Sequence, residues 1–251
     1  MNDEFYIGWQ SKAPARTGRT LRFAIVTLLA APLVLALTLA ATQRTIGRAV
    51  FEWGQVKEFS GMLKAAPVPH LIVAGQATNE SATHYLVNPW KFGLDPLLAR
   101  QFDGQNVTLR GTRIFRDDQR MIEVLPGSIV AAKDSPRSAP GPEPASLGRQ
   151  TFVGEIVDSK CFLGVMNPGQ LKTHRACAVR CISGGIPPVL LVRQADGTAR
   201  YLLLVSHDGK PVNKAVLSLV AEPVEITGDV ERLGDLLVLR ADPAAYRRVG
   251  N

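Results

Sequence analysis

The sequence has few aromatic residues and none of the motifs that mark common enzyme families. Phe, Trp and Tyr make up 6% of its 251 residues, whereas barrels that bind single-stranded nucleic acid stack bases on aromatic side chains. It contains no paired carboxylates at a believable separation, no glycine-rich phosphate loop and no nucleophilic serine motif. These absences argue against nucleic-acid binding and favour a role other than catalysis. A thiolate nucleophile with His174 as its base stays open.

The N-terminal region holds an uncharged run from Phe23 to Thr42. As a helix, this run reaches roughly 30 Å, the thickness of the hydrocarbon core of a bilayer. It exceeds the ~7–15 apolar residues of a cleaved signal peptide, and no clean A-x-A site follows it. We therefore predict a transmembrane helix over residues 23–43, with a cleaved signal peptide as the alternative.

The orientation of this helix is predicted from its flanks. Lys and Arg are more numerous in residues 12–22 than directly after the apolar run. The positive-inside rule then places residues 1–22 in the cytoplasm and the bulk of the chain outside. The prediction is a single-pass protein of a bacterial inner membrane, with most of the chain in the periplasm.

The remainder of the chain reads as two copies of one unit. Residues 131–149 are rich in proline and lack an apolar period, which is typical of an extended linker. On either side, residues 52–130 and 150–246 show the same succession of strand-like runs. The spacing V-x-[LI]-x-G, at Val107 and again at Val224, anchors the match.

Each copy contains five strand-like runs and one segment with helical spacing, at residues 95–102 and 213–220. A helix between the third and fourth strands of a five-stranded unit is the element order of an OB-like barrel. We therefore predict a mostly β fold in which an N-terminal helix precedes two tandem OB-like barrels. A pair of less regular β sandwiches is the alternative.

The second copy carries an insertion, residues 158–188, between its first two strands. The insertion is not needed to close the barrel, so we interpret it as the functional loop of the protein. Its segment THRACAVRCISGG has helical spacing, with Thr173 as a candidate N-cap and Gly184 at the C-terminal end.

All three cysteines of the chain lie in this insertion. On the predicted helix, His174, Cys177 and Cys181 fall at i, i+3 and i+7, on one face. Cys161, which leaves the first strand, can close over that face. One imidazole and three sulfurs form the ligand set of a tetrahedral metal site, and thiolates select zinc, copper(I) or iron-sulfur clusters. Met166 is a further candidate ligand if the metal is copper.

A disulfide is the main alternative to the metal site. Cys161 paired with Cys177 or Cys181 would staple the insertion to the barrel and leave one odd thiol. Cys177 with Cys181 is the poorer pair, because one helical turn does not bring two sulfurs into disulfide geometry. Buried, inert cysteines are the third interpretation. Basic residues surround the sulfurs in the sequence and would favour thiolates; they are Lys160, Lys172, Arg175 and Arg180.

The segments VDSKC, HRACAVRC and GGIPP, between residues 154 and 188, resemble those of a largely uncharacterised group of exported bacterial proteins. The resemblance implies an exported, OB-like barrel with a site at the Cys/His loop. It does not indicate which reaction, if any, takes place there. Together these features predict a membrane-anchored accessory protein or subunit that carries a metal or redox-thiol site. It would serve a membrane electron-transfer complex or a metal-delivery step, with the bilayer and a membrane-complex protein as partners. The alternative is a structural or assembly protein whose cysteines staple a loop.

Overall fold

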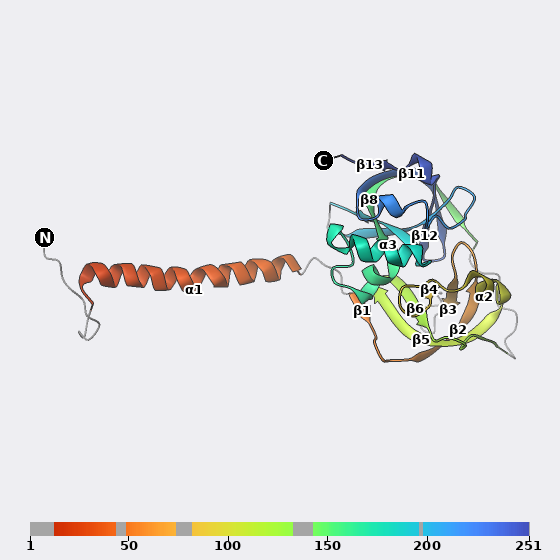
Figure 1. The fold of residues 1–251 in the computed structure, drawn as a ribbon, viewed down its shortest axis with the longest axis horizontal. Coiled ribbons are helices and arrows are strands. Elements are labelled where there is room, and N and C mark those ends of the chain that lie inside the picture. The colour runs from red at the N-terminus through yellow and green to blue at the C-terminus, as the bar shows by residue number, and fades with distance from the viewer. Residues whose placement is uncertain (1–12, 44–48, 74–81, 133–142, 196–197, 251) are drawn as a thin grey trace. The chain divides into compact units, whose positions relative to one another are not determined.

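The computed structural model describes residues 13–43, 49–73, 82–132, 143–195 and 198–250 (Figure 1). The chain divides into two units, Met1–Gly47 and Arg48–Asn251. The described part of the first unit is a helix, and the second unit contains all the described strands. Most of the predicted linker and the first half of the predicted cytoplasmic tail lie outside the described residues.

The helix α1 (Ala15–Gln43) contains the apolar run, with Pro32 inside it. The most apolar 18-residue window within Ala15–Thr42 has a mean hydropathy of 2.5, and none of that window is buried against other described residues. A helix of this length and composition can cross a bilayer, and signal sequences share both properties. The helix begins before the predicted span, so Arg16, Arg19 and Arg22 belong to the same helix.

The first barrel closes on itself. Its strands are β2 (Lys57–Lys64), β3 (His70–Val73), β4 (Ala82–Val87), β5 (Asn106–Arg116) and β6 (Gln119–Val124). They pair in the order β2-β3-β4-β6-β5-β2, with β4 and β6 parallel and the other pairs antiparallel. Two short strands, β1 (Ala49–Phe51) and β7 (Val130–Ala131), add to β5. Closure leaves the five main strands without a free edge.

The second barrel repeats this order. Its strands are β8 (Ala145–Asp158), β9 (Pro188–Arg193), β10 (Ala199–Val205), β11 (Pro223–Leu233) and β12 (Leu236–Arg240). They pair in the order β8-β9-β10-β12-β11-β8, with β10 and β12 parallel. The short β13 (Arg247–Arg248) adds to β11. The predicted fold class, an apolar N-terminal helix followed by two five-stranded OB-like barrels, is confirmed.

The repeated V-x-[LI]-x-G spacing has a structural cause. A Cβ atom at Gly111 would lie 2.5 Å from the Glu123 carbonyl oxygen, and one at Gly228 would lie 2.3 Å from the Arg240 carbonyl oxygen. Each glycine therefore lets the fourth strand of its barrel approach the fifth more closely than a side chain allows. The valine and the branched residue of the motif are buried in both copies.

One of the two helices predicted at equivalent positions is wrong. In the first barrel α2 (Pro96–Gln101) forms as expected, and the Asp95 side chain caps it by accepting from the Leu97 amide at 2.9 Å. In the second barrel the segment 213–220 forms turns and the single 3-10 turn η3 (Leu217–Leu219). A second short 3-10 turn, η4 (Pro243–Ala245), follows β12.

The reason for this difference lies in Asn213. Its side-chain amide donates to the carbonyls of Ile182 and Ile186, at 2.8 Å each, and so ties the segment to the insertion. The three buried valines around it, at four-residue spacing, give the helical pattern; they are Val212, Val216 and Val220. So short a segment gains little from helix propagation.

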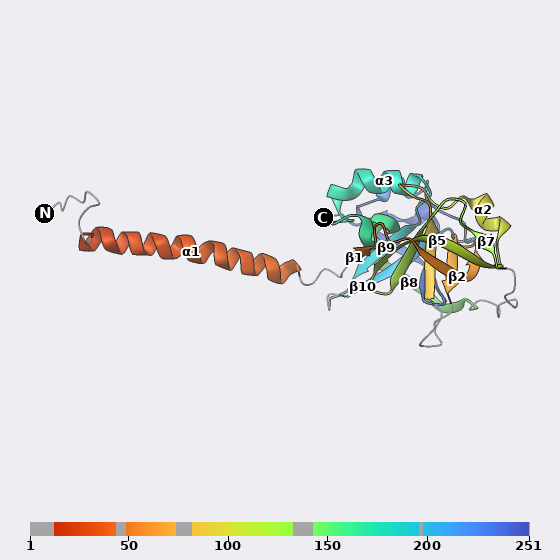
Figure 2. The same cartoon turned by 90° about the horizontal axis from the view of Figure 1, so that it is seen from below.

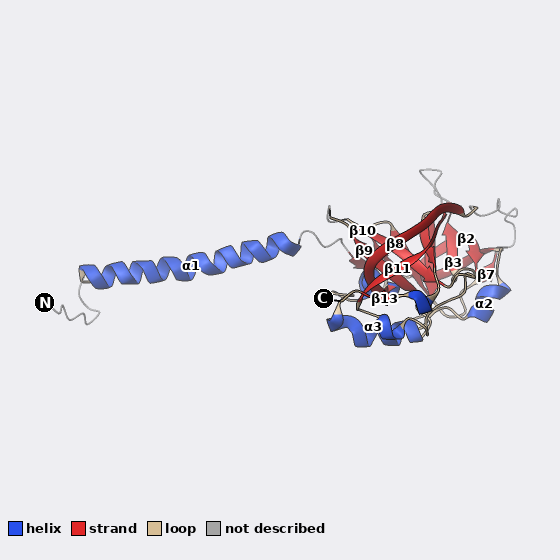
Figure 3. Ribbon diagram, turned by 90° about the horizontal axis from the view of Figure 1, so that it is seen from above, coloured by secondary structure: helices blue, strands red, loops and turns tan. Residues whose placement is uncertain are grey.

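The insertion lies between β8 and β9 and folds as η1 (Cys161–Val165), η2 (Lys172–His174) and α3 (Arg175–Ser183). Phe162 and Leu163 of η1 are buried in one hydrophobic core with Tyr85 and Ile114 of the first barrel and Leu203 of the second. Figures 2 and 3 show α2 and α3 on the same side of the strands. The insertion is therefore part of the interface between the barrels, and it places its cysteines there.

Candidate metal centre

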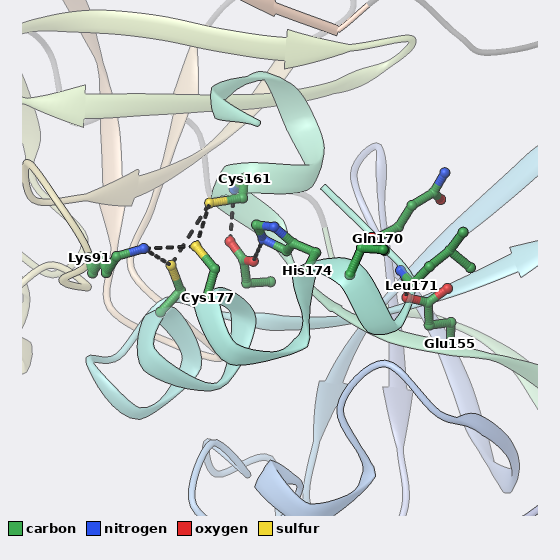
Figure 4. Close-up of polar contacts among 10 residues, drawn as sticks. Lys91, Glu155, Cys161, Gln170, Leu171, His174 and Cys177 are labelled. Carbon is green, nitrogen blue, oxygen red and sulfur yellow. Dashed lines mark hydrogen bonds and ion pairs between the residues drawn. The ribbon is translucent and has the colours of Figure 1, made fainter. Parts of the chain in front are cut away.

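The three cysteines of the insertion meet in one cluster, with Cys161 from η1 and Cys177 and Cys181 from α3. The Sγ atom of Cys161 lies 3.9 Å from the Sγ of Cys177 and 3.9 Å from the Sγ of Cys181. All three sulfurs lie within 4.8 Å of one another, and none forms a disulfide. Cys161 and Cys181 are buried, and Cys177 is half-buried. Figure 4 shows Cys161 and Cys177 pointing toward one another from η1 and α3.

Local sequence features hold the sulfurs in this arrangement. Cys177 and Cys181 are one turn apart on α3, and so share a face of the helix. The helix ends as predicted, because the Gly184 amide bonds to the carbonyls of Arg180 and Cys181 at 3.0 and 3.1 Å. Thr173 does not cap the helix. His174 occupies the N-cap position, and its side chain makes no capping bond.

The loop between η1 and η2 returns across Cys161. A Cβ atom at Gly169 would lie 2.6 Å from Phe162 Cα and 2.7 Å from the Cys161 carbonyl oxygen. Only glycine allows this approach, so Gly169 closes one side of the site. Met166, a candidate ligand from the sequence, follows η1 and is exposed.

The imidazole of His174 is bound to a carboxylate that was not among the residues predicted from the sequence. His174 Nε2 lies 2.9 Å from Asp158 Oδ2, and both side chains are buried. The other carboxylate oxygen accepts the Cys161 amide at 2.7 Å. Asp158, Cys161 and His174 have candidate ligand atoms within 4.8 Å of one another. The cluster therefore consists of two overlapping groups that share Cys161, and His174 is in the group without Cys177 and Cys181.

A lysine from the first barrel reaches the sulfurs. Lys91 Nζ donates to Cys177 Sγ at 2.8 Å and to Cys181 Sγ at 3.7 Å (Figure 4). It lies in the loop after β4, residues 88–93, which we call the Lys91 loop. Lys91 was not among the basic residues predicted around the thiols. Lys160 and Arg175 instead pair with Glu123 and Glu222.

The insertion holds the Lys91 loop in place through hydrogen bonds to the backbone of the loop. The Gly93 amide bonds to the Gly184 carbonyl at 3.0 Å. Lys160, 2% exposed, donates to the carbonyls of Asn88 and Trp90 at 2.9 and 2.6 Å. The lysine at the thiol cluster is thus positioned by the same insertion that carries the cysteines.

The electrostatics of the site favour an unequal sharing of protons. A hydrogen bond from Cys161 lowers the pKa of the Cys181 thiol, and the charge of Lys91 contributes. The hydrogen bond with Cys181, burial and the negative charge of Asp158 all raise the pKa of Cys161. The bond to Cys177 raises the pKa of Lys91. Of these two thiols, Cys181 therefore loses its proton more readily than Cys161, and the neighbouring Lys91 keeps its positive charge.

Two residues of the cluster, Asp158 and Lys91, have weak signals in the sequence. Asp158 stands in VDSKC, directly after the buried Ile156 and Val157 of β8, where a buried carboxylate needs partners. Lys91 stands between Trp90 and Phe92, in the other barrel. Sequence spacing carries no information on which loop of one barrel meets the insertion of the other.

No protein-family model matches the chain, and none of the curated proteins searched is detectably similar to it. The chemistry of the site therefore rests on its own geometry. Thiolates close together, next to a histidine and an aspartate, could hold a metal ion.

Proposed function

We propose that the protein is a membrane-anchored accessory protein whose second barrel binds a soft metal ion through Cys161, Cys177 and Cys181. The observation that carries the proposal is the 3.9 Å separation of Cys161 Sγ from each of the other two sulfurs. Two thiolates about 2.3 Å from one metal ion lie about 3.8 Å apart in a tetrahedral arrangement and about 4.0 Å apart in a trigonal one. The free sulfurs are thus already spaced for a shared ion.

The donor set favours copper(I) over zinc. Structural zinc sites use four protein ligands, and within the described residues the three-sulfur group contains no imidazole or carboxylate. Three soft thiolates are a ligand set that copper(I) accepts. In the metal-free chain, the Lys91 ammonium places a positive charge beside the sulfurs of Cys177 and Cys181.

The apolar helix supports the biological setting that we propose. Helix α1 anchors the chain in the inner membrane, with the two barrels in the periplasm. Cys177 is only half-buried, so a partner protein can approach one ligand of the ion. We propose that the protein holds the metal for, or delivers it to, a membrane electron-transfer complex.

Metal binding by the full-length protein in detergent tests this proposal. After anaerobic purification with a reductant, the protein is given copper(I) or zinc, dialysed and analysed for metal and free thiols. The wild type retains one equivalent of copper, and Cys161→Ser, Cys177→Ser and Cys181→Ser each lose it. Met166→Leu is the matched control and retains the ion.

The His174→Ala variant separates the two metals. A three-sulfur copper site survives this substitution, whereas a Cys3His zinc site does not. Absence of bound metal in the reduced wild type, or equal retention by Cys161→Ser, would contradict the proposal. If the cysteine variants instead unfold at lower temperature and metal never binds, the cysteines have a structural role.

A further inference from the structure

The contact between Lys91 and Cys177 is closer than an ordinary hydrogen bond to sulfur. Their Nζ and Sγ atoms are 2.8 Å apart. Hydrogen bonds from nitrogen to oxygen span about 2.7–3.2 Å, and sulfur is the larger atom. The pair therefore stands at a distance that a single bridging atom can span.

The fold enforces this approach from both sides. Lys160 holds the carbonyls of Asn88 and Trp90 on one flank of Lys91, and the Gly93–Gly184 backbone bond holds the other flank. At Trp90 the backbone has φ 64°, in the left-handed region, and the indole is 81% exposed. A bulky residue in this conformation is strained, and such strain persists where the surroundings impose it. The turn sends Trp90 outward and Lys91 inward to the sulfurs.

We propose that Lys91 and Cys177 form an oxidative cross-link, in which one oxygen atom bridges Nζ and Sγ. Dioxygen is the oxidant. The Lys91 ammonium gives one proton to the solvent, and the thiol and the resulting amine then react with one O2 to give Cys–S–O–NH–Lys and one water. Sulfur and nitrogen each lose two electrons, dioxygen gains four, and the S–H hydrogen and one N–H hydrogen leave in the water. Four equivalents of a thiol reductant return the cysteine, the lysine and one water, with two disulfides as the products.

The geometry favours this bridge over a disulfide. A disulfide bond requires about 2.05 Å between sulfurs, and Cys161 is 3.9 Å from both partners. To form a disulfide from Cys161, η1 and α3 would have to move closer together within a packed core that contains Phe162. The Lys91–Cys177 bridge needs no such movement. Cys177 is also the only one of the three thiols that is not buried, so a small oxidant reaches it first.

The bridge would act as a covalent tie between the barrels. It joins the Lys91 loop of the first barrel to α3 of the second, and it removes one sulfur from the proposed metal site. The inference shares Cys177 with that site but does not depend on metal binding, because the bridge forms in the metal-free chain.

Peptide mass spectrometry of the full-length protein tests the inference. The metal-free, reduced protein in detergent is exposed to dioxygen and digested with trypsin without a reductant. We expect a cross-linked species with the Lys91 and Cys177 peptides, uncleaved at Lys91. Its mass exceeds the sum of the two peptides by one oxygen less two hydrogens. Dithiothreitol abolishes it.

Four variants test which two side chains form the bridge. Lys91→Arg keeps the positive charge and Cys177→Ser keeps the size, and both lose the cross-linked species completely. Cys181→Ser retains it, as does Lys172→Arg, the matched control at a lysine of the insertion. Cleavage at Lys91 in the oxidised wild type would overturn the inference, as would a Cys161 disulfide in place of the bridge. Metal content is measured on reduced protein, so failure of the metal site and failure of the bridge are told apart.

Discussion

The ammonium of Lys160 lies 2.5 Å from the carboxylate of Glu123, although the two residues belong to different barrels. Lys160 follows β8, directly before Cys161, and Glu123 is in β6. With its two bonds to the Lys91 loop, the Lys160 side chain joins the first barrel to the cysteine insertion. The buried lysine is thus a structural part of the site rather than one of its solvent-facing cations.

Lys160→Met is expected to destabilise the protein. Removing one partner of a buried ion pair leaves the other charge uncompensated, at a cost of about 3–5 kcal/mol. Because the Glu123 side chain keeps 15% exposure, we expect the lower end of that range. Denaturant unfolding of the full-length protein in detergent measures it. Lys210→Met, which breaks the exposed Lys210–Asp208 pair, is the control and leaves the unfolding midpoint unchanged. Equal effects of the two substitutions would refute the structural role of Lys160.

Gly93→Ala is expected to displace the Lys91 loop. The added Cβ would lie 2.2 Å from the Gly185 carbonyl oxygen, so the loop must move away from α3. Overpacking of this kind costs about 1–3 kcal/mol, and the thermal midpoint should fall. Gly250→Ala, where nothing lies within 4 Å of the new Cβ, provides the matched control. If Gly93→Ala melts at the wild-type temperature, the tight contact between the loop and α3 does not exist in solution.

Stability should fall as the pH drops from neutral. Burial lowers the pKa of His84 from 6.5 to about 4. Between these two pH values, the unfolded chain therefore binds a proton at His84 and the folded chain does not. The stability from neutral His84 is complete above the unfolded pKa and is lost as the pH falls from 6.5 toward 4. The loss amounts to about 3 kcal/mol, at 1.36 kcal/mol for each pKa unit. Burial also lowers the pKa of His70, which adds to the same trend.

Unfolding free energies measured at pH 7.5, 5.5 and 4.5 check this dependence. His84→Gln should flatten the slope, and the remaining slope should fall further in the His84→Gln, His70→Gln double variant. A wild-type stability that is constant over this range would show that His84 is not buried in its neutral form.

Lys91→Met should raise the pH at which the cluster forms its thiolate. The positive charge of Lys91 contributes to the lowered pKa of Cys181, so its removal moves that pKa upward. Ultraviolet absorbance of the thiolate, followed across a pH titration of the reduced protein, measures the shift. Lys91→Arg keeps the charge and should keep the wild-type midpoint. Identical titrations of Lys91→Met and wild type would place the lysine away from the thiols.

The sequence predicted the barrels because the repeat contains the residues that close them. Gly111 and Gly228 mark the same close strand contact, and the alternating valines and leucines define the buried faces. The helix predicted over 213–220 was wrong because buried valines at four-residue spacing resemble a helix face. The Asn213 bonds to the insertion are tertiary and cannot be read from that pattern.

The convergence of Cys161, Cys177 and Cys181 was predictable because the insertion is a single continuous segment. The position of Lys91 was not, because it depends on how one barrel packs on the other. The predicted role of His174 as a ligand stays a prediction, and its bond to Asp158 gives the imidazole a partner that the spacing of the cysteines did not suggest.

X-ray absorption at the copper edge of the reduced, copper-loaded, full-length protein shows which atoms bind the ion. We expect three sulfur neighbours at about 2.3 Å from one copper ion, with one sulfur fewer in Cys177→Ser. A first shell of nitrogen or oxygen atoms, or a sulfur count unchanged by that substitution, would contradict it.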